Sequence, residues 1–337
     1  TGDAFQAAAA FNADKKIAAC VSWAPDIYNL ADVKGNKLLV SSATANKLIA
    51  DVWFARADFA NDHPAIIEGL VSGIFDGIEA MQSPDGKAKA AQLLSEAYSL
   101  PLTEATGMMV DAHNTNFAEN REFFLNANNP TNFERTWNTA YFLYKRIGSV
   151  QSKIAFDQVM DFTYIKKLNA NPKYANQTSD YGITFAPQSV DVIQAEDPIL
   201  VKTVTIHFYP NSWDLNKKLS KTTNGKTYDE LYDPSIPAII EEVGTLAGQY
   251  GAARIVIEGH TDSSLKGRVD ASLVNELSQN RANSVKEAIV KKFPGLQANQ
   301  FSVIGKGWDV PADPDDPLNQ ARNRRVEIKV YPAEMPE

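Results

Sequence analysis

"IEGHTDSS", residues 257–264, ends an apolar run and then presents an imidazole, a hydroxyl and a carboxylate in succession. The run that leads into it, "RIVIEG" at 254–259, has the composition of a buried strand. Gly259 closes that run, so the carboxylate of Asp262 follows the carboxyl end of the strand. A charged group at that position needs a partner, which the rest of the chain has to supply.

The pattern around this stretch predicts a sheet covered by helices. "TVTIHF" alternates apolar and polar residues, as a half-buried strand does. The expected elements are a strand at 203–208, a helix at about 234–250, the strand at 254–259, a helix at about 272–292, and strands at 301–305 and 324–331. Strands that alternate with helices in this βαβαββ order indicate an α/β layer.

The second of these helices carries a charge on its expected inner face. Four-residue spacing aligns Leu273, Leu277, Arg281, Val285 and Ile289, so a guanidinium occupies a position where an apolar side chain is expected. An unpaired buried ion costs several kcal/mol, as a rough estimate, and Arg281 therefore needs a partner.

Asp262 is a candidate for that partnership, in either of two ways. Ligands bind where loops gather at the carboxyl ends of strands, and Arg281 can reach the same crevice. An acid and a base held apart suit a zwitterion, whose ammonium meets Asp262 and whose carboxylate meets Arg281. A direct Asp262–Arg281 salt bridge that closes the domain explains the pattern equally well.

Four ordered motifs carry a resemblance over roughly residues 200–332. "IEGHTD", "LSQNRANSVKEAI", "GKGWDVP" and "NRRVEI" resemble the OmpA-like peptidoglycan-binding domain of OmpA C-termini, Pal lipoproteins and MotB-type stator proteins. The resemblance implies a noncovalent grip on the peptide stem of the cell wall, through diaminopimelate, and it favours the ligand interpretation of the two charges.

The resemblance also implies a set of binding residues. Asp262 would bind the ammonium and Arg281 the carboxylate, while Asn211 matches an amide after the first strand. Asn323 and Arg324 match the closing motif. For the neighbouring Arg325 a solvated strand start is expected instead.

This sequence departs from the family pattern before the Leu-Ser pair. The usual Asn is replaced by Val274, and Asn275 stands one position late, so that Asn275 either substitutes with a shifted backbone or the hydrogen bond is lost. One lost bond to a charged group costs about 1.5–3 kcal/mol.

The first half is expected to be mixed α/β. An apolar stripe predicts a helix over 61–81, and the short apolar runs at 16–23, 36–42 and 51–57 have the composition of strands. A further helical block is expected over about 87–168.

This half resembles, more loosely, the later part of periplasmic solute-binding proteins of the nitrate, sulfonate and thiamine-precursor type. The resemblance rests on 7–26, 51–74 and 156–168. The fold class expected for the whole chain is thus α/β. It comprises a partial type II solute-binding-protein-like module at 1–170, expected to be incomplete at its N-terminus, a linker at 171–199, and an OmpA-like βαβαββ domain at 200–337. Trp23, Ser41, Ser42 and Thr44 stand where the clefts of such proteins lie.

Composition excludes several other functions. A net charge of −8 over 337 residues argues against nucleic acid as a partner. The four histidines are scattered singly, and neither a GxSxG elbow nor a phosphate-binding loop occurs, so we expect no catalytic residues, no metal and no cofactor. No stretch is long and apolar enough to span a bilayer, and any membrane anchor is expected upstream of Thr1.

These observations predict a non-catalytic protein of the periplasm or cell envelope, in a bacterium with a diaminopimelate-type wall. Its partner would be the stem peptide of peptidoglycan, together with a small solute or an inner-membrane partner for the first module. Two alternatives stay open. In the first, the chain is an ABC-transporter-type substrate receptor that is localised by a wall-binding domain. In the second, it is the wall-anchoring subunit of a MotB-like ion-driven motor.

Overall fold

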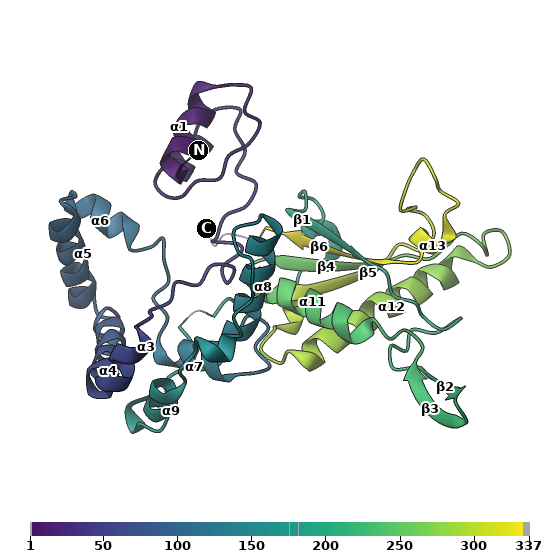
Figure 1. Cartoon of the computed structure of the whole chain (residues 1–337). Coiled ribbons are helices and arrows are strands. Elements are labelled where there is room, and N and C mark those ends of the chain that lie inside the picture. The colour runs from purple at the N-terminus through teal and green to yellow at the C-terminus, as the bar shows by residue number, and fades with distance from the viewer. Residues whose placement is uncertain (1, 175, 181, 333–337) are drawn as a thin grey trace. The chain divides into compact units, whose positions relative to one another are not determined.

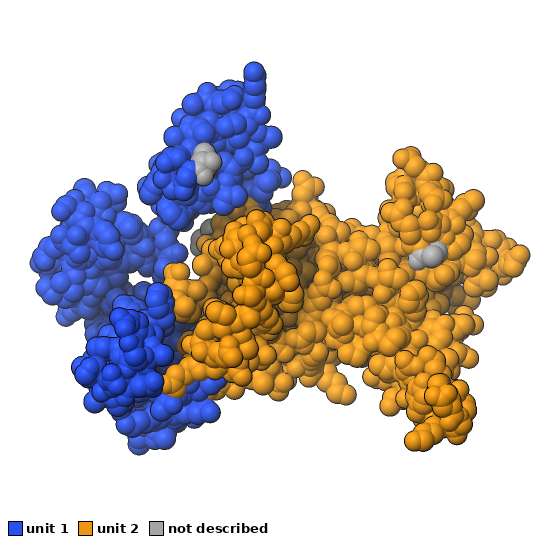
Figure 2. All heavy atoms as spheres, in the orientation of Figure 1, with its two compact units in different colours: residues 1–39, 53–121, 162–181 blue, residues 40–52, 122–161, 182–337 orange. Residues whose placement is uncertain are grey.

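A computed structural model describes residues 2–174, 176–180 and 182–332. The chain divides into two compact units, which Figure 2 colours separately. Unit 1 comprises residues 1–39, 53–121 and 162–181, and unit 2 comprises 40–52, 122–161 and 182–337. The domain division expected at 171–199 stays a prediction.

Helices dominate the chain before residue 200. They are α1 (Ala4–Ala13), α2 (Asp26–Ala31), α3 (Ala57–Asp62), α4 (Pro64–Ala80), α5 (Pro84–Tyr98), α6 (Leu102–Met108), α7 (Phe117–Leu125), α8 (Phe133–Arg146), α9 (Thr163–Asn169) and α10 (Val190–Ile193), with short 3₁₀ turns at Phe156–Gln158 and Pro172–Tyr174. None of the helices in the described residues has both the length and the apolar character that crossing a membrane requires.

The helix expected over 61–81 is confirmed as α4, with Pro64 in its first turn, where a missing N–H costs nothing. Unit 1 builds a small aromatic core on it. Phe75 of α4 packs edge-on against Phe117, which stacks on Tyr174, with ring centroids 5.3 and 4.6 Å apart. All three side chains are buried.

The three strands expected in the first half are wrong. The runs at 16–23, 36–42 and 51–57 form no strand in the described residues, and they leave large apolar side chains in solvent, with Phe54 94% and Trp53 78% exposed. A strand is stabilised by hydrogen bonds to a neighbouring strand. The apolar composition was present here, but the described residues supply no strand beside these runs, so the part before residue 200 is helical rather than mixed α/β.

Unit 2 contains a four-stranded sheet in the order β1-β6-β4-β5 (Figure 1). Its strands are β1 (Leu200–Val204), β4 (Arg254–Gly259), β5 (Phe301–Gly305) and β6 (Val326–Tyr331). β4 runs parallel to β5 and antiparallel to β6, and β1 pairs antiparallel with β6. The two long helices α11 (Ile236–Gln249) and α12 (Ala271–Lys292) alternate with the strands as the expected βαβαββ order has it. The short α13 (Gln320–Asn323), between β5 and β6, was not predicted, and β1 lies at 200–204 rather than at the expected 203–208.

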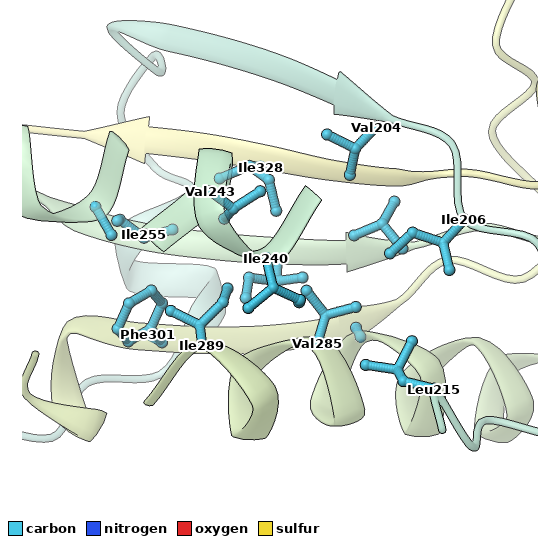
Figure 3. Close-up of a cluster of buried hydrophobic side chains, with 14 of the residues drawn as sticks. Val204, Ile206, Leu215, Ile240, Val243, Ile255, Val285, Ile289, Phe301 and Ile328 are labelled. Carbon is cyan, nitrogen blue, oxygen red and sulfur yellow. The ribbon is translucent and has the colours of Figure 1, made fainter. Parts of the chain in front are cut away.

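One face of the sheet packs against α11 and α12 to form the main core (Figure 3). Ile255 and Ile257 of β4 point to this face and are fully buried, as are Val285 and Ile289 of α12. Every residue of β4 is buried, because this central strand is covered on both faces. A continuous apolar run is typical of such a strand.

Residues 183–199 cover part of the other face. Ile193 of α10 packs against Val256 and Tyr331, and the backbone N–H of Ile199 donates to Val330 O at 2.8 Å. The Arg254 guanidinium donates to Ala186 O at 2.8 Å.

A two-stranded hairpin that was not predicted lies between β1 and α11 in the chain and forms a separate sheet. Strands β2 (Lys218–Thr223) and β3 (Lys226–Leu231) pair in register around Asn224 and Gly225, and the hairpin projects from the domain in Figure 1. Both turn residues have positive φ, at +53° and +75°. The Asn-Gly pair is a strong two-residue hairpin signal and could have revealed this element.

The N-terminal half of α12 lies unusually close to the sheet. A Cβ added to Gly259 of β4 would lie 2.1 Å from Ser278 O, and one added to Gly305 of β5 would lie 2.3 Å from Asn275 O. Both oxygens belong to the helix backbone and cannot move aside, so only glycine allows the helix to lie this close to the strands.

This close contact corrects the expected inner stripe of α12. Leu273 is 60% exposed and Leu277 is only partly buried, whereas Val274, Ser278 and Ala282 face inward. Small side chains are selected there because the backbones touch. Arg281 therefore lies beside the contact rather than in its centre.

We expect Gly259→Ala and Gly305→Ala each to lower the free energy of unfolding by at least about 2 kcal/mol, because the added methyl group has no space among backbone atoms. Urea denaturation checks this. Gly295→Ala is the matched control: no atom lies within 4 Å of its added Cβ, so it should change stability by less than about 0.5 kcal/mol. Equal stability of all three variants would contradict the proposed contact.

Candidate functional site: charged groups at the carboxyl end of β4

Asp262 lies just beyond the end of β4 and is held by two neighbours. Its Oδ1 accepts from the backbone N–H of Ser264 at 2.9 Å and also from the Ser264 hydroxyl. Its Oδ2 accepts from Arg324 Nη1 at 2.8 Å. Burial raises the pKa of Asp262, but the bonds from Ser264 and Arg324 outweigh it, and the net pKa lies below the ordinary value. The group is a carboxylate at neutral pH.

Arg281 reaches the same edge from α12. Its guanidinium stands over the ring of Phe208, 4.8 Å from the ring centroid, and its Nε donates to Ser212 O at 3.2 Å. Burial lowers the pKa of Arg281, and the nearby charge of Asp262 offsets part of that effect. A guanidinium stays protonated under these conditions.

Asp262 and Arg281 form no ion pair with each other in the described structure. The direct salt bridge considered from the sequence is therefore not formed. Asp262 pairs instead with Arg324, whose side chain is 47% exposed. No carboxylate of the described residues lies within ion-pair distance of Arg281, although the charge of Asp262 is close enough to act on it.

The two predicted asparagines around this pair have different surroundings. Asn211 is exposed and adopts a φ of +52°, in the turn that also carries Ser212. Asn323 is 3% exposed, and its side chain bridges Ala312 N at 2.9 Å and Pro317 O at 2.9 Å. These bonds fix the backbone of the loop before β6. Asn323 therefore has a structural role beside the site.

Asn275 lies over the turn that follows β5. Its Oδ1 is so close to Gly307 that a Cβ added there would lie 2.1 Å from it. Gly307 has a φ of +52°, and its carbonyl accepts from the backbone N–H of Thr261 at 2.8 Å. The side chain of Asn275 thus borders the turn that supports the residue before Asp262, while Val274 is buried.

The comparisons with known proteins bear on this part of the chain. Residues 228–325 match the model of the OmpA family. This stretch forms an OmpA-like domain. No curated protein matches the sequence.

Several solved structures are similar to this domain. The periplasmic domain of Helicobacter pylori MotB is 21% identical and covers 40% of this chain and 83% of its own, with a TM-score of 0.29. The peptidoglycan-associated lipoprotein from Burkholderia pseudomallei is 20% identical and covers 38% and 88%, with a TM-score of 0.26. An outer membrane protein from Borrelia burgdorferi is 23% identical and covers 39% and 86%, with a TM-score of 0.26. The family match is what identifies the domain.

The second face of the OmpA-like domain holds a buried charge cluster. Glu258 Oε2 accepts from Lys329 Nζ at 2.7 Å, and Glu258 Oε1 accepts from Gln194 Nε2 at 2.5 Å. Glu327 Oε1 accepts from Arg325 Nε at 2.6 Å. The fully buried His260 has its Nε2 3.6 Å from Glu258 Oε2. The imidazole of "GHTD" therefore belongs to this cluster.

Glu258, His260 and Glu327 are near enough to one another, within 4.8 Å, to hold a metal ion. Carboxylates and imidazole are suitable ligands for divalent metals. However, Lys329 and Arg325 already neutralise the two carboxylates, so a metal ion would have to displace a cation of the protein itself. The two carboxylates are therefore already paired with cations of the protein, whereas neither ring nitrogen of His260 has a hydrogen-bond partner among the described residues.

Arg325 corrects one expectation from the sequence. It is 5% exposed and donates to Val310 O as well as to Glu327, so it is not a solvated strand start. Strand alternation places Arg325 on the same face as Glu327 and opposite to Val326, so the pattern predicts exposure. The burial of Arg325 instead follows from its contacts with Glu327 and Val310 O.

The residues suggested for a solute site lie elsewhere. Trp23 is 55% exposed in unit 1 and packs edge-on against Phe5. Ser41, Ser42 and Thr44 belong to a turn in unit 2, where Ser41 O accepts from Thr44 N at 3.1 Å. Nothing in the comparisons supports a solute-binding module, and a cleft at these residues stays a prediction.

Glu258 gives the domain a defined pH dependence. Burial raises the pKa of Glu258, but His260, Lys329 and Gln194 beside its carboxylate outweigh burial and lower the pKa from 4.5 to about 2. A carboxylate with a lowered folded-state pKa stabilises the fold above pH 4.5, and this contribution is lost as the pH falls through about 2.

We therefore expect Glu258→Gln to lower the free energy of unfolding at pH 7 by on the order of 3 kcal/mol. The difference from the wild type should shrink as the pH falls from 4.5 toward 2. Chemical denaturation across this range measures it. Glu276→Gln, at an exposed position of α12, is the control and should show a small difference at every pH. A Glu258→Gln deficit that stays constant with pH would contradict the assignment.

Proposed function

We propose that the OmpA-like domain binds peptidoglycan noncovalently, through an amino acid of the stem peptide that carries a separate ammonium and carboxylate. Diaminopimelate is such a residue. Asp262 receives the ammonium and Arg281 receives the carboxylate. The protein is then a non-catalytic component of the cell envelope.

One observation carries this proposal: Arg281 is a partly buried guanidinium with no carboxylate partner among the described residues, and Asp262 stands at the same edge. A bidentate carboxylate stabilises a cation that is removed from water more than it stabilises an exposed cation. Arg281 still has N–H groups beyond the one that donates to Ser212 O, and these can donate to both carboxylate oxygens of a ligand.

Arg324 is then a positioning residue. Its bond to Asp262 Oδ2 and the bonds from Ser264 to Oδ1 fix the carboxylate plane. A carboxylate oxygen has two lone-pair sites, so the ammonium can bond to Asp262 without removing these donors. We expect Asn211, which precedes Ser212 in the turn, and Asn275, over the Gly307 turn, to contact the bound residue as well.

The solute receptor and the MotB-like motor subunit are predictions from the sequence, and no described residue favours either one over wall anchoring.

Binding to purified, fluorescently labelled sacculi tests the proposal. We expect Asp262→Asn and Arg281→Ala each to weaken binding at least tenfold, because each removes one charged hydrogen-bond partner. Free diaminopimelate should compete with sacculi for the wild type. Asp309→Asn, an exposed acid after the Gly307 turn, is the control and should bind like the wild type.

Equal binding of all four proteins, with unchanged thermal melting, would rule out this site. Loss of binding in the Asp309→Asn control as well would show that the effect is not specific to the two named groups.

A further inference from the structure

The turn that contacts Arg281 is a rigid surface element. Phe208 packs against the main core and Leu215 is 5% exposed within it, so both ends of the turn at 209–214 are anchored. Inside the turn, Ser212 N donates to Tyr209 O at 3.0 Å, and Asp214 N donates to the Ser212 hydroxyl at 3.1 Å. These bonds define the shape of the turn without a ligand.

Large aromatic side chains are exposed on and beside this turn. Tyr209 is 39%, Trp213 49% and Tyr232 38% exposed. Tyr209 and Tyr232 pack edge to face with ring centroids 5.5 Å apart, and Lys217 Nζ lies 5.2 Å from the Tyr209 centroid.

The segment that carries Tyr232 is also fixed. The buried Asp233 accepts from the backbone N–H groups of His207 and Ser235, at 2.8 and 2.9 Å. Exposed aromatic rings on rigid backbone lose little entropy when a ligand covers them.

The turn at 209–214 is in direct contact with the site described above. Ser212 O accepts directly from Arg281 Nε, and Trp213 is the next residue. A ligand residue held by Arg281 therefore lies beside the turn that carries Trp213.

We propose that Tyr209, Trp213 and Tyr232 form a subsite for the sugar rings of the glycan strand to which the stem peptide is attached. The proposal rests on the proposed function of the Asp262–Arg281 site. A pyranose ring presents an apolar face of C–H groups edged with hydroxyls, and an aromatic ring with a polar tip matches both.

The length of the stem supports this occupant over a separate protein. An extended residue spans at most about 3.6 Å, so a stem of a few residues brings the sugars within about 10 Å of the residue held by Arg281. The glycan is thus the part of the same ligand that must pass near this turn. A second copy of the chain is the competing occupant.

Two soluble wall fragments separate the two sites. Muramidase digestion releases a disaccharide–tetrapeptide, and amidase treatment of the same fragment gives the free tetrapeptide. Isothermal titration calorimetry then measures the Kd of both fragments for the whole chain. We expect the wild type to bind the disaccharide form about tenfold more tightly, the increment that aromatic packing typically supplies.

Trp213→Ala should remove this preference and leave the Kd of the free tetrapeptide unchanged within about twofold. Trp213→Phe, which keeps an aromatic ring, should retain most of the preference. Tyr228→Ala is the matched control, because Tyr228 is 47% exposed on β3, outside the turn, and it should behave like the wild type.

The other outcomes overturn the subsite. Equal affinity of the wild type for both fragments would leave wall anchoring intact without a sugar subsite. An equal loss of both affinities in Trp213→Ala would show that Trp213 acts on the peptide site. Concentration-dependent dimerisation of the wild type, abolished by Trp213→Ala with no sugar preference, would assign the surface to a second copy. Failure of the wild type to bind either fragment would overturn the proposed function itself.

Discussion

The backbone of α12 touches the backbone of β4 and β5, and the candidate site depends on this contact. Gly259 and Gly305 allow the approach, and Ser278 fastens it, because its hydroxyl donates to Asn275 O at 2.8 Å and accepts from Gly307 N at 3.0 Å. The helix, the end of β4 and the turn after β5 are therefore one rigid piece. Arg281 lies one helical turn beyond Ser278, so its position relative to Asp262 is set by backbone packing rather than by the two charges.

The charged side chains of the OmpA-like domain are fully paired on its second face but not at the carboxyl end of β4. On the second face, Glu258 and Glu327 are matched by Lys329 and Arg325 at 2.6 to 2.7 Å, within a buried network. At the carboxyl end of β4 the charges do not close in this way, because Arg281 lacks a carboxylate partner among the described residues. Complete pairing serves the fold, since leaving a buried charge alone is costly. Incomplete pairing at an accessible edge is a reason to expect a ligand.

The parts of the fold that were predictable are the strands that consist of a continuous apolar run, whereas the strand expected from alternation at 203–208 lies at 200–204. The strands 254–259 and 301–305 were placed from their apolar pattern, and the structure gives the same bounds. The register of α12 was not predictable in the same way. Four-residue spacing selected Leu273 as inward, whereas the contact with two glycines requires small residues and turns Leu273 outward. The presence of Arg281 at the site could be anticipated, and the family resemblance placed Asn211 of the neighbouring turn beside it. The bond from Arg281 to Ser212 O could not be anticipated from the pattern of α12, because that turn is distant in sequence.

Energetics favour the proposed zwitterion over a simple anion at this edge. The Asp262–Arg324 pair is partly exposed, and such a pair contributes about 0–1 kcal/mol, so a ligand ammonium can share Asp262 at little cost. Arg281 is more withdrawn from water, and burial disfavours its charge. A carboxylate that reaches Arg281 gains from the lower local dielectric, whereas a lone anion would also meet the negative charge of Asp262. Only a ligand with a positive group at the Asp262 end converts that repulsion into attraction, and the fixed separation of the two side chains then selects for the distance between its charges.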